Sequence, residues 1–253
     1  MRAEIAVQMA AAGAHRARID GTTNGCRPPK DASRATSRWS VRLVGVNVGA
    51  VQHSAEPPVD EPVETSVAAY TANAREYART HATRMSSQVA RFAAALPVPS
   101  LILDAGCGPG RDLARFVSAG HLPRGLDLNH AFAEMAAKIA PTDRADLRDV
   151  ASLYPQRTFD GIWAAASLVH LSRPTTHSVL SQFAFVVRPG GKLFACLRSE
   201  GDTGWLDEPD GTRWYTVWRP DDFATAIANA GFEIDEVTPG VYVEVWATRR
   251  QNA

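Results

Sequence analysis

The chain has 253 residues, of which 45% are hydrophobic and 21% are charged, a composition that suits one α/β core. Its 27 basic residues equal its 27 acidic ones, so no overall positive charge points to nucleic-acid binding. Three cysteines, Cys26, Cys107 and Cys196, include no closely spaced pair. This spacing argues against a zinc site or a disulfide framework and indicates a reducing, cytoplasmic compartment.

The first 60 residues differ from the rest in composition. They hold eight Lys and Arg, five Asp and Glu and two Pro-Pro pairs, with no sustained hydrophobic period. This predicts a disordered arm over residues 1–60 and a folded domain over residues 61–253. The apolar stretches Ile5 to Ala14 and Val41 to Val51 are shorter than the roughly 20 residues of a membrane span, so no membrane partner is expected. The domain keeps 19 basic and 22 acidic residues, which favours a small or neutral ligand.

Deleting residues 1–60 is expected to leave the melting temperature and the cofactor affinity nearly unchanged. A segment of this composition buries too little apolar surface to offset the entropy of ordering it. Thermal melting of the full chain and of the truncated chain checks this expectation. A large drop in stability would instead show that Val41 to Val51 is a strand of the core.

Residues 64–96 have the apolar spacing of an amphipathic helix. Its apolar and aromatic positions are Val67, Tyr70, Ala74, Tyr77, Met85, Val89, Phe92 and Leu96. Pro97 and Pro99 end the pattern. We expect this helix to precede the sheet and to cover the ligand.

A buried strand and a glycine-rich turn follow at LILDAGCGPG, residues 101–110. The apolar run ends in Asp104, and Gly106, Gly108 and Gly110 occupy every second position before a helix that starts at Arg111. Glycines at this density allow unusual backbone φ angles and leave no Cβ between the backbone and a ligand. The pattern therefore predicts a cradle for a nucleotide-sized ligand at a helix N-terminus.

Asp127 lies near the end of the second predicted strand, RGLDL, residues 124–128. It follows Asp104 by 23 residues, close to the spacing of about 20 at which nucleotide-binding α/β folds place an acid on a ribose. One carboxylate can accept hydrogen bonds from both ribose hydroxyls. The glycine turn alone fits an NAD site as well, so a dinucleotide enzyme stays open as an alternative.

The remaining elements alternate between strands and helices. Strands are predicted at residues 145–147, at residues 159–166 and, after a Pro-Gly-Gly turn, at the end of residues 186–197. Helices are predicted at residues 111–119, 130–140, 174–187 and 220–230. The strands at residues 232–237 and 241–248 must pair antiparallel, because three residues cannot form a parallel crossover. The order predicts a doubly wound α/β fold with a seven-stranded, mostly parallel sheet and a C-terminal antiparallel hairpin.

The motif D-x-G-x-G-x-G from Asp104 to Gly110 and the RPGG turn from Arg188 resemble those of class I S-adenosylmethionine-dependent methyltransferases. The resemblance covers about residues 65–250 and includes the order of the elements. The motif differs from the dinucleotide fingerprint G-x-G-x-x-G, and the usual dinucleotide fold lacks a terminal antiparallel strand. The resemblance implies a Rossmann-like methyltransferase fold and S-adenosylmethionine as the cofactor, and it makes an NAD enzyme the weaker alternative.

The resemblance also implies roles for single residues. Residues 104–110 would line the methionine part of the cofactor, Asp127 and Leu128 the ribose, and Asp146 and Leu147 the adenine. The alternative for Asp146 is a solvated loop acid, and the alternative for Tyr77 is burial in the helix face. The expected cofactor-binding residues are Tyr77, Asp104, Ala105, Gly106, Cys107, Gly108, Gly110, Asp127, Leu128, Asp146, Leu147 and Ala165.

Methyl transfer from a sulfonium needs alignment and exclusion of water, and it needs a base only where the acceptor carries an O–H or N–H. His170, after the fourth strand, is the candidate base, and the alternative is that it holds the loop. Aromatic residues between Trp205 and Trp218 suit a flat or apolar acceptor, or else they anchor the loop to the core. The expected substrate-pocket residues are Ser167, Arg198, Trp214, Tyr215 and Trp218. No metal site is expected.

The predicted function is methyl transfer to a small-molecule acceptor. The segment RWYTVWRPDDFATAIANAGF from Arg213 resembles one in methyltransferases related to enzymes that modify the tRNA wobble uridine. An RNA-modifying methyltransferase is therefore one alternative. A non-catalytic cofactor-binding protein is another, and the intact glycine cradle and Asp127 argue against it.

Overall fold

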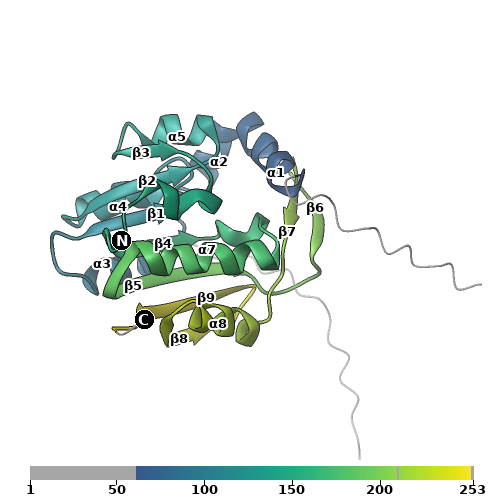
Figure 1. Cartoon of the computed structure of the whole chain (residues 1–253). Coiled ribbons are helices and arrows are strands. Elements are labelled where there is room, and N and C mark those ends of the chain that lie inside the picture. Colours follow the sequence, from purple (N-terminus) through teal and green to yellow (C-terminus); the bar gives the residue numbers. More distant parts are fainter. Residues whose placement is uncertain (1–60, 210, 252–253) are drawn as a thin grey trace, which may run out of the picture. The chain divides into compact units, whose positions relative to one another are not determined.

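The computed structural model describes residues 61–209 and 211–251, so the arm predicted over residues 1–60 lies outside the described residues. Seven of the described strands form one sheet in the order β3-β2-β1-β4-β5-β9-β8 (Figure 1). They are β1 (Leu101–Ala105), β2 (Leu122–Asp127), β3 (Thr142–Arg144), β4 (Phe159–Ala165), β5 (Val187–Arg198), β8 (Phe232–Thr238) and β9 (Tyr242–Arg249). Strands β1 to β5 are parallel, whereas β9 is antiparallel to β5 and β8. The predicted sheet and its C-terminal hairpin are confirmed.

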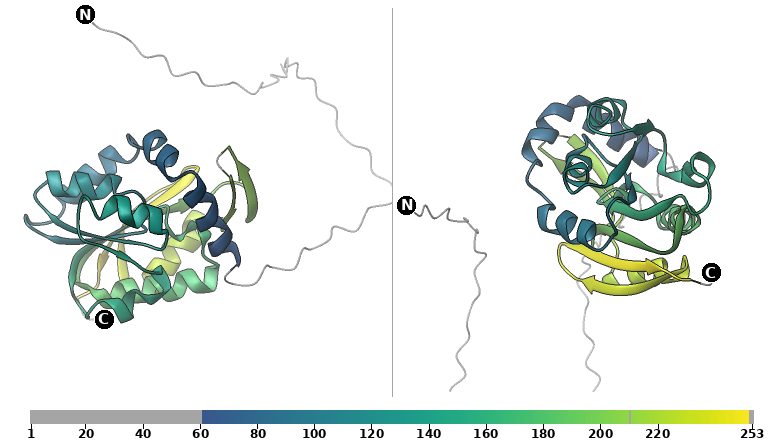
Figure 2. Two further views of the ribbon diagram at one scale, coloured as in Figure 1. Left: turned by 90° about the horizontal axis from the view of Figure 1, so that it is seen from above. Right: turned by 90° about the vertical axis from the view of Figure 1, so that its left-hand side faces the viewer.

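Helices cover both faces of this sheet. The described helices are α1 (Glu61–Ala72), α2 (Ala74–Thr80), α3 (Ser86–Ala94), α4 (Arg111–Ser118), α5 (His130–Ala136), α6 (Val150–Leu153), α7 (Arg173–Val186) and α8 (Pro220–Asn229), of which α1 packs on β7 rather than on a face of this sheet. Neighbouring residues of β1 point to opposite faces: Ile102 packs with Phe92 and Phe116, and Leu103 lies in the cluster of Val179 and Phe183. Figure 2 shows the β8–β9 hairpin, in yellow, at one edge of the sheet. None of the described helices is long and apolar enough to cross a membrane.

The single helix predicted over residues 64–96 is wrong, because the chain forms α1, α2 and α3 there. Met85 adopts a left-handed backbone with φ of 63° just before α3. In the turn that precedes it, the carbonyls of His81 and Ala82 accept hydrogen bonds from Arg111 and Arg115 of α4. These hydrogen bonds come from a distant helix, so the local apolar period carries no sign of the break.

The third strand was predicted at residues 145–147, and this placement is wrong. Strand β3 comprises residues 142–144, which pair with β2 from Gly125 to Asp127. An ion pair of 2.6 Å between Arg124 and Asp143 joins the two strands. Asp146 instead caps the short 3-10 helix η1 (Leu147–Asp149) by accepting a hydrogen bond from the backbone N–H of Arg148.

The connection after β5 is also more regular than predicted. It forms a second, two-stranded antiparallel sheet of β6 (Gly204–Glu208) and β7 (Gly211–Tyr215), in which Trp205 lies opposite Trp214. Strand β5 itself starts at residue 187, before the Pro-Gly-Gly turn, because Val187 already pairs with Phe159 of β4. The Pro-Gly-Gly signal in the sequence instead predicts a strand that begins after the turn.

Candidate functional site

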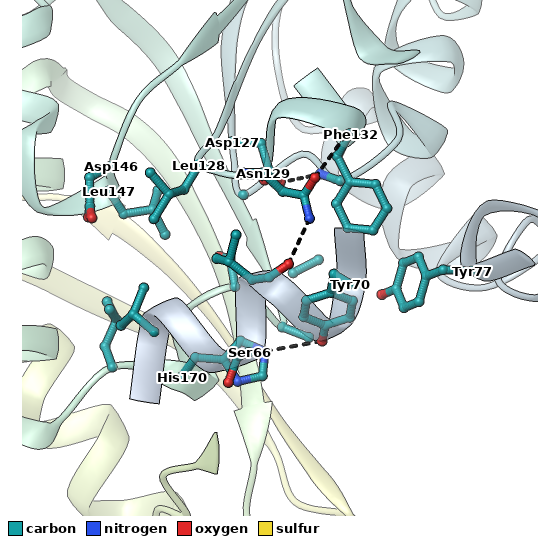
Figure 3. Close-up of a pocket in the computed structure, with 18 residues that line it drawn as sticks. Ser66, Tyr70, Tyr77, Asp127, Leu128, Asn129, Phe132, Asp146, Leu147 and His170 are labelled. Atoms are coloured by element: carbon teal, nitrogen blue, oxygen red, sulfur yellow. Dashed lines mark hydrogen bonds between the residues drawn. The ribbon is translucent and has the colours of Figure 1, made fainter. Parts of the chain in front are cut away.

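Three cavities meet at the carboxyl ends of β1, β2 and β4. Tyr77 of α2 and Ala165 of β4 line all three of them. The first, which we call the glycine cavity, lies against the β1–α4 turn and is lined by residues that include Asp104, Cys107 and Gly108. The second lies between α1 and the ends of β2 and β4, and its lining includes Val67, Asp127 and Leu147 (Figure 3). We call it the nucleoside cavity, after the part of the cofactor expected there. The arginine chamber, of about 410 Å³, opens beyond Ala165 between β5, β7 and β9. A ligand that passes through this junction touches all three spaces.

Asp127 is the main polar group of the nucleoside cavity. Its Oδ2 accepts a hydrogen bond of 2.7 Å from the Gly108 N–H, and its Oδ1 accepts one of 2.8 Å from the Asn129 N–H. Each carboxylate oxygen has two acceptor sites, so both retain capacity for a ligand hydroxyl. Burial raises the pKa of this carboxyl to about 6, and the two N–H donors oppose the rise. The group remains ionised at neutral pH and can bind a diol.

All three glycines of the turn have positive φ angles, and Gly106 and Gly108 differ in their surroundings. Gly106 has φ of +79°, and a Cβ there would lie 2.3 Å from the Ser167 Cβ. Gly108 has φ of +54°, and a Cβ there would meet no protein atom within 4 Å. Gly106 is therefore required by packing between two loops, whereas Gly108 leaves open a space that a ligand can fill.

Asp104 ends the apolar part of β1 and lines the glycine cavity. Its side chain is buried, and its Oδ2 has no hydrogen-bond partner among the described residues. Burial and the nearby charge of Asp112 raise the pKa of this carboxyl well above its usual value, and Arg111 opposes the rise. A buried oxygen without a partner is costly, so it is suited to a cationic or N–H-bearing group of a ligand.

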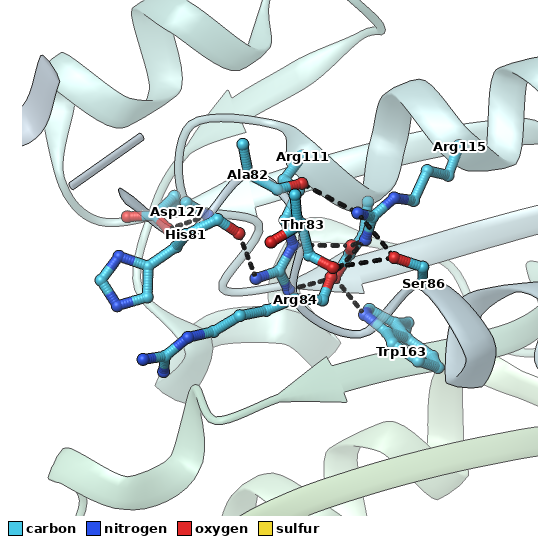
Figure 4. Close-up of polar contacts among 11 residues, drawn as sticks. His81, Ala82, Thr83, Arg84, Ser86, Arg111, Arg115, Asp127 and Trp163 are labelled. Atoms are coloured by element: carbon cyan, nitrogen blue, oxygen red, sulfur yellow. Dashed lines mark hydrogen bonds and ion pairs between the residues drawn. The ribbon is translucent and has the colours of Figure 1, made fainter. Parts of the chain in front are cut away.

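A polar cluster that includes Arg111, Arg115 and Trp163 holds the turn between α2 and α3 (Figure 4). The Asp112 carboxylate is 2.6 Å from Arg111 and 2.9 Å from Arg115, and it accepts a hydrogen bond from Trp163 Nε1. The two arginines in turn bind the carbonyls of residues 81 and 82. The turn between α2 and α3 is thus tied to α4, which fixes Tyr77 over the junction.

His170 lies in the 3-10 helix η2 (Leu168–His170) after β4, and it faces Tyr70 of α1. Its Nδ1 is 2.5 Å from the Trp214 carbonyl oxygen, which only accepts hydrogen bonds, so Nδ1 carries the proton. Its Nε2 therefore accepts from the Tyr70 hydroxyl at 3.1 Å. Burial lowers the pKa of His170 to about 4, so the ring is neutral above that pH.

The polar groups and the open space of these cavities match the parts of S-adenosylmethionine. Asp127 can bind the ribose diol, the space over Gly108 admits the ligand against the backbone, and Asp104 offers a buried acceptor oxygen. The aromatic and apolar walls of the nucleoside cavity suit a flat base. They include Val67, Leu128, Phe132 and Leu147.

Residues 102–191 match the family model described as "Methyltransferase domain". The solved 1,6-didemethyltoxoflavin-N1-methyltransferase of Burkholderia thailandensis, with bound S-adenosylhomocysteine, superposes with a TM-score of 0.61 at 21% identity. That match covers 78% of this chain and 93% of the other. Residues 102–191 are therefore similar to a methyltransferase domain, and the described residues share the fold of the solved enzyme. The resemblance of its glycine motif to this family is confirmed.

The curated relatives of the chain differ in the acceptors that they name. The 27-O-demethylrifamycin SV methyltransferase of Amycolatopsis mediterranei is 34% identical over 41% of this chain and 41% of its own. The tRNA (carboxymethyluridine(34)-5-O)-methyltransferase of Arabidopsis thaliana is 29% identical over 53% and 31%. The trans-aconitate 2-methyltransferase of Methylobacterium nodulans is 30% identical over 60% and 57%. The chain spans less than two thirds of the length of each of these relatives.

The structure brings most of the predicted cofactor residues to the three cavities. Those that line the nucleoside cavity are Tyr77, Gly106, Gly108, Asp127, Leu128, Asp146, Leu147 and Ala165. Asp104 and Cys107 line the glycine cavity. Ala105 is buried in the core and Gly110 packs against α5, so neither lines any of the three cavities. The binding roles of all twelve residues stay predictions.

The predicted substrate-pocket residues separate into three groups. Arg198 and Tyr215 line the arginine chamber, and Ser167 lines the nucleoside cavity instead. Trp214 packs edge-on against Trp205, outside the three cavities. Trp218 is 2% exposed, packs against Phe223 and lies outside the three cavities as well. This packing agrees with the alternative, an anchor between the loop and the core, and the substrate roles of all five residues stay predictions.

Several cavity residues were missed by the sequence analysis. Asn129 caps α5 and donates hydrogen bonds to the Thr71 hydroxyl and the Val67 carbonyl, which ties α1 to the cavity rim. An asparagine just before a predicted helix is a capping signal that could have identified it. Arg84 and Arg213 reach the arginine chamber only through the tertiary fold, and no local pattern marks them.

We expect His170 to position Tyr70 rather than to act as a base. His170→Ala should then lower stability and cofactor affinity together with the rate, because it removes the partner of the Tyr70 hydroxyl. With the cofactor at saturation, so that the titration of Asp127 near pH 6 does not limit binding, the wild-type rate should show no inflection near pH 6.5, because His170 is already neutral there. Kinetics from pH 5 to pH 8 and calorimetry of cofactor binding test this. A loss of 10²-fold to 10⁴-fold in kcat at unchanged cofactor affinity would identify a general base instead.

Proposed function

We propose that this protein transfers the methyl group of S-adenosylmethionine to a small-molecule acceptor held in the arginine chamber. The observation that carries the proposal is the junction at Tyr77 and Ala165, where the glycine cavity, the nucleoside cavity and the chamber meet. A methyl donor seated in the first two cavities places its reactive centre beside the third. Alignment of donor and acceptor across such a junction is the main demand of methyl transfer.

The bound cofactor supplies an activated methyl group. The protein's own residues bind and orient: Asp127 would hold the ribose, Leu147 would contact the adenine, and Asp104 would face the cationic methionine part. Tyr70, fixed by His170, forms part of the wall between the nucleoside cavity and the chamber. Tyr77 packs edge-on against it at 5.1 Å and helps to exclude water from the junction.

Two observations favour a small acceptor. The chamber volume of about 410 Å³ lies within the range of small-molecule pockets, and aromatic side chains line it. The names of two curated relatives and of the solved toxoflavin enzyme specify small acceptors. We also propose that residues 61–253 are the catalytic domain and that it works in the cytoplasm.

Modification of tRNA is the second candidate, favoured by the relative from Arabidopsis thaliana. Incubation with methyl-labelled S-adenosylmethionine and either a metabolite extract or bulk tRNA separates the two candidates. Label in the metabolite fraction alone supports the small-molecule proposal, and label in tRNA alone contradicts it. Cofactor binding without transfer to either fraction supports the non-catalytic alternative.

Cofactor choice is tested by thermal melting with S-adenosylhomocysteine and with NAD. A ligand at 100 times its dissociation constant stabilises the folded protein by about 2.7 kcal/mol. We expect a rise in melting temperature with S-adenosylhomocysteine and none with NAD, because the motif lacks the glycine spacing that holds a pyrophosphate. A rise with NAD alone would overturn the proposal.

A further inference from the structure

The arginine chamber carries more positive charge than the composition of the domain suggests. Four arginines and two glutamates line it. The arginines are Arg84, Arg111, Arg198 and Arg213, and the glutamates are Glu208 and Glu244. A domain with an excess of acidic residues therefore concentrates cations around the space next to the junction. Local charge in a concave site, rather than net charge, decides which small ligand is attracted.

Two of the four arginines are occupied by the protein itself. Arg111 pairs with Asp112, and Arg213 pairs with Glu208 at 2.9 Å. Arg198 instead donates its Nε to the Glu200 carbonyl, and its guanidinium lies over the Tyr215 ring at 5.5 Å. Within residues 61–209 and 211–251, neither Arg84 nor Arg198 has a carboxylate at ion-pair distance. Both can therefore bind an anion without breaking an existing pair.

The positive charges act on the same part of the chamber. Burial raises the pKa of both Tyr77 and Tyr242, and Arg84 opposes the rise at each. Arg198 also acts on Tyr242, its direct neighbour across the β5–β9 pairing. Arg84 and Arg198 line the same chamber as Tyr77, the residue at the junction, and as Tyr242. Both phenols keep their protons at neutral pH and can donate hydrogen bonds to an anion.

The carboxylates of the chamber are already engaged. Glu208 accepts from Arg213 and from the Tyr215 hydroxyl at 2.9 Å, and Glu244 accepts from Gln88. His170 lines the nucleoside cavity rather than the chamber. An acceptor that is already deprotonated needs no base, whereas an alcohol acceptor does. If the acceptor were an alcohol, the candidate base would be His81, which lines the chamber.

From these contacts we propose that the acceptor is a small carboxylic acid, bound as the carboxylate by Arg84 and Arg198. The planar guanidinium fork matches the geometry of a carboxylate. A carboxylate oxygen forms the new O–CH₃ bond while the methyl–sulfur bond breaks and its electron pair returns to sulfur. The products are a methyl ester and S-adenosylhomocysteine, and no proton is released. This inference rests on the proposed methyltransferase function.

The test measures the binding of succinate and propane-1,2,3-tricarboxylate to the protein saturated with S-adenosylhomocysteine. The corresponding neutral amides serve as ligand controls. We expect one of the two acids to bind and the amides to be at least 10-fold weaker. Arg198→Gln and Arg84→Gln should each weaken the acid about 10-fold or more and leave S-adenosylhomocysteine binding within 2-fold. Arg79→Gln, which removes an exposed arginine paired with Glu76, should change neither.

The chemistry is tested with methyl-labelled S-adenosylmethionine and a metabolite extract. A carboxyl methyl ester releases volatile labelled methanol in mild base, whereas an O-methyl ether or N-methyl product does not. Label that is released by base supports the inference. Label that is stable to base overturns it and favours an alcohol acceptor with His81 as the base. Equal binding of acids and amides, binding of neither acid, or acid binding unchanged in both arginine variants also overturns it. Failure of S-adenosylhomocysteine to bind the unmodified protein would instead refute the proposed function itself.

Discussion

Replacing Asp127 with alanine is expected to weaken S-adenosylhomocysteine binding by roughly 10²-fold or more. The carboxylate is the acceptor for both ribose hydroxyls in the proposed complex, and hydrogen bonds to a charged group contribute about 1.5–3 kcal/mol each. The same side chain also holds the N–H groups of Gly108 and Asn129, so its loss loosens the cradle as well. Isothermal titration calorimetry of the purified variant measures the change.

Asp146→Ala is the matched control for that experiment. Asp146 lines the same cavity, but its carboxylate pairs with Arg148 at 2.8 Å and caps η1. We expect its removal to weaken the ligand less than 10-fold. The melting temperature of each variant without ligand shows whether the loss of affinity comes from a loosened fold. Equal losses in the two variants would assign no special role to Asp127.

The affinity for S-adenosylhomocysteine should also fall as the pH falls through about 6. Burial raises the pKa of Asp127 to about 6, so the acceptor carboxylate is present above that pH and is progressively protonated below it. Each pH unit below the pKa should raise the dissociation constant by up to about 10-fold. Titrations between pH 4.5 and pH 8 test this. An affinity independent of pH over that range would show that the ionised carboxylate is not the ribose acceptor.

The sheet could be predicted because its determinants are local. The apolar run before Asp104, the glycine turn and the short loop after residue 238 each restrict the chain within a few residues. The errors in the predicted elements occur where contacts with residues distant in the sequence determine the local structure. The turn after α2 is stabilised by Arg111 and Arg115, and β3 is fixed by its pairing with β2. In both cases the stabilising residues lie elsewhere in the sequence, so the local pattern gives no sign of them.

The same distinction holds for the site. The residues expected to face the nucleoside could be predicted from the ends of β1 and β2, because a strand end fixes the position of the next side chain. The chamber instead combines the turn before α3, the end of β5 and the β6–β7 hairpin. Trp218 illustrates the difficulty, since its aromatic ring suits a pocket or a core equally well and only the packing against Phe223 decides.

Replacing Gly106 with alanine is expected to lower the melting temperature strongly and to abolish cofactor binding. The new Cβ would lie 2.3 Å from the Ser167 Cβ, and the residue would keep a φ of +79° that alanine adopts at a cost of about 1–2 kcal/mol. Overpacking of this kind costs about 1–3 kcal/mol more. Thermal melting without ligand measures the combined loss.

Gly108→Ala separates the two effects of that substitution. Its Cβ would meet no protein atom within 4 Å, so only the cost of a φ of +54° applies to the fold. The variant should therefore fold with a modest drop in melting temperature, yet bind S-adenosylhomocysteine at least 10-fold more weakly, because the Cβ enters the space proposed for the ligand. Adding Ser167→Gly to Gly106→Ala should recover part of the lost stability, since it removes the atoms at 2.3 Å and 3.2 Å. Normal cofactor affinity in Gly108→Ala would place the ligand elsewhere than against this turn.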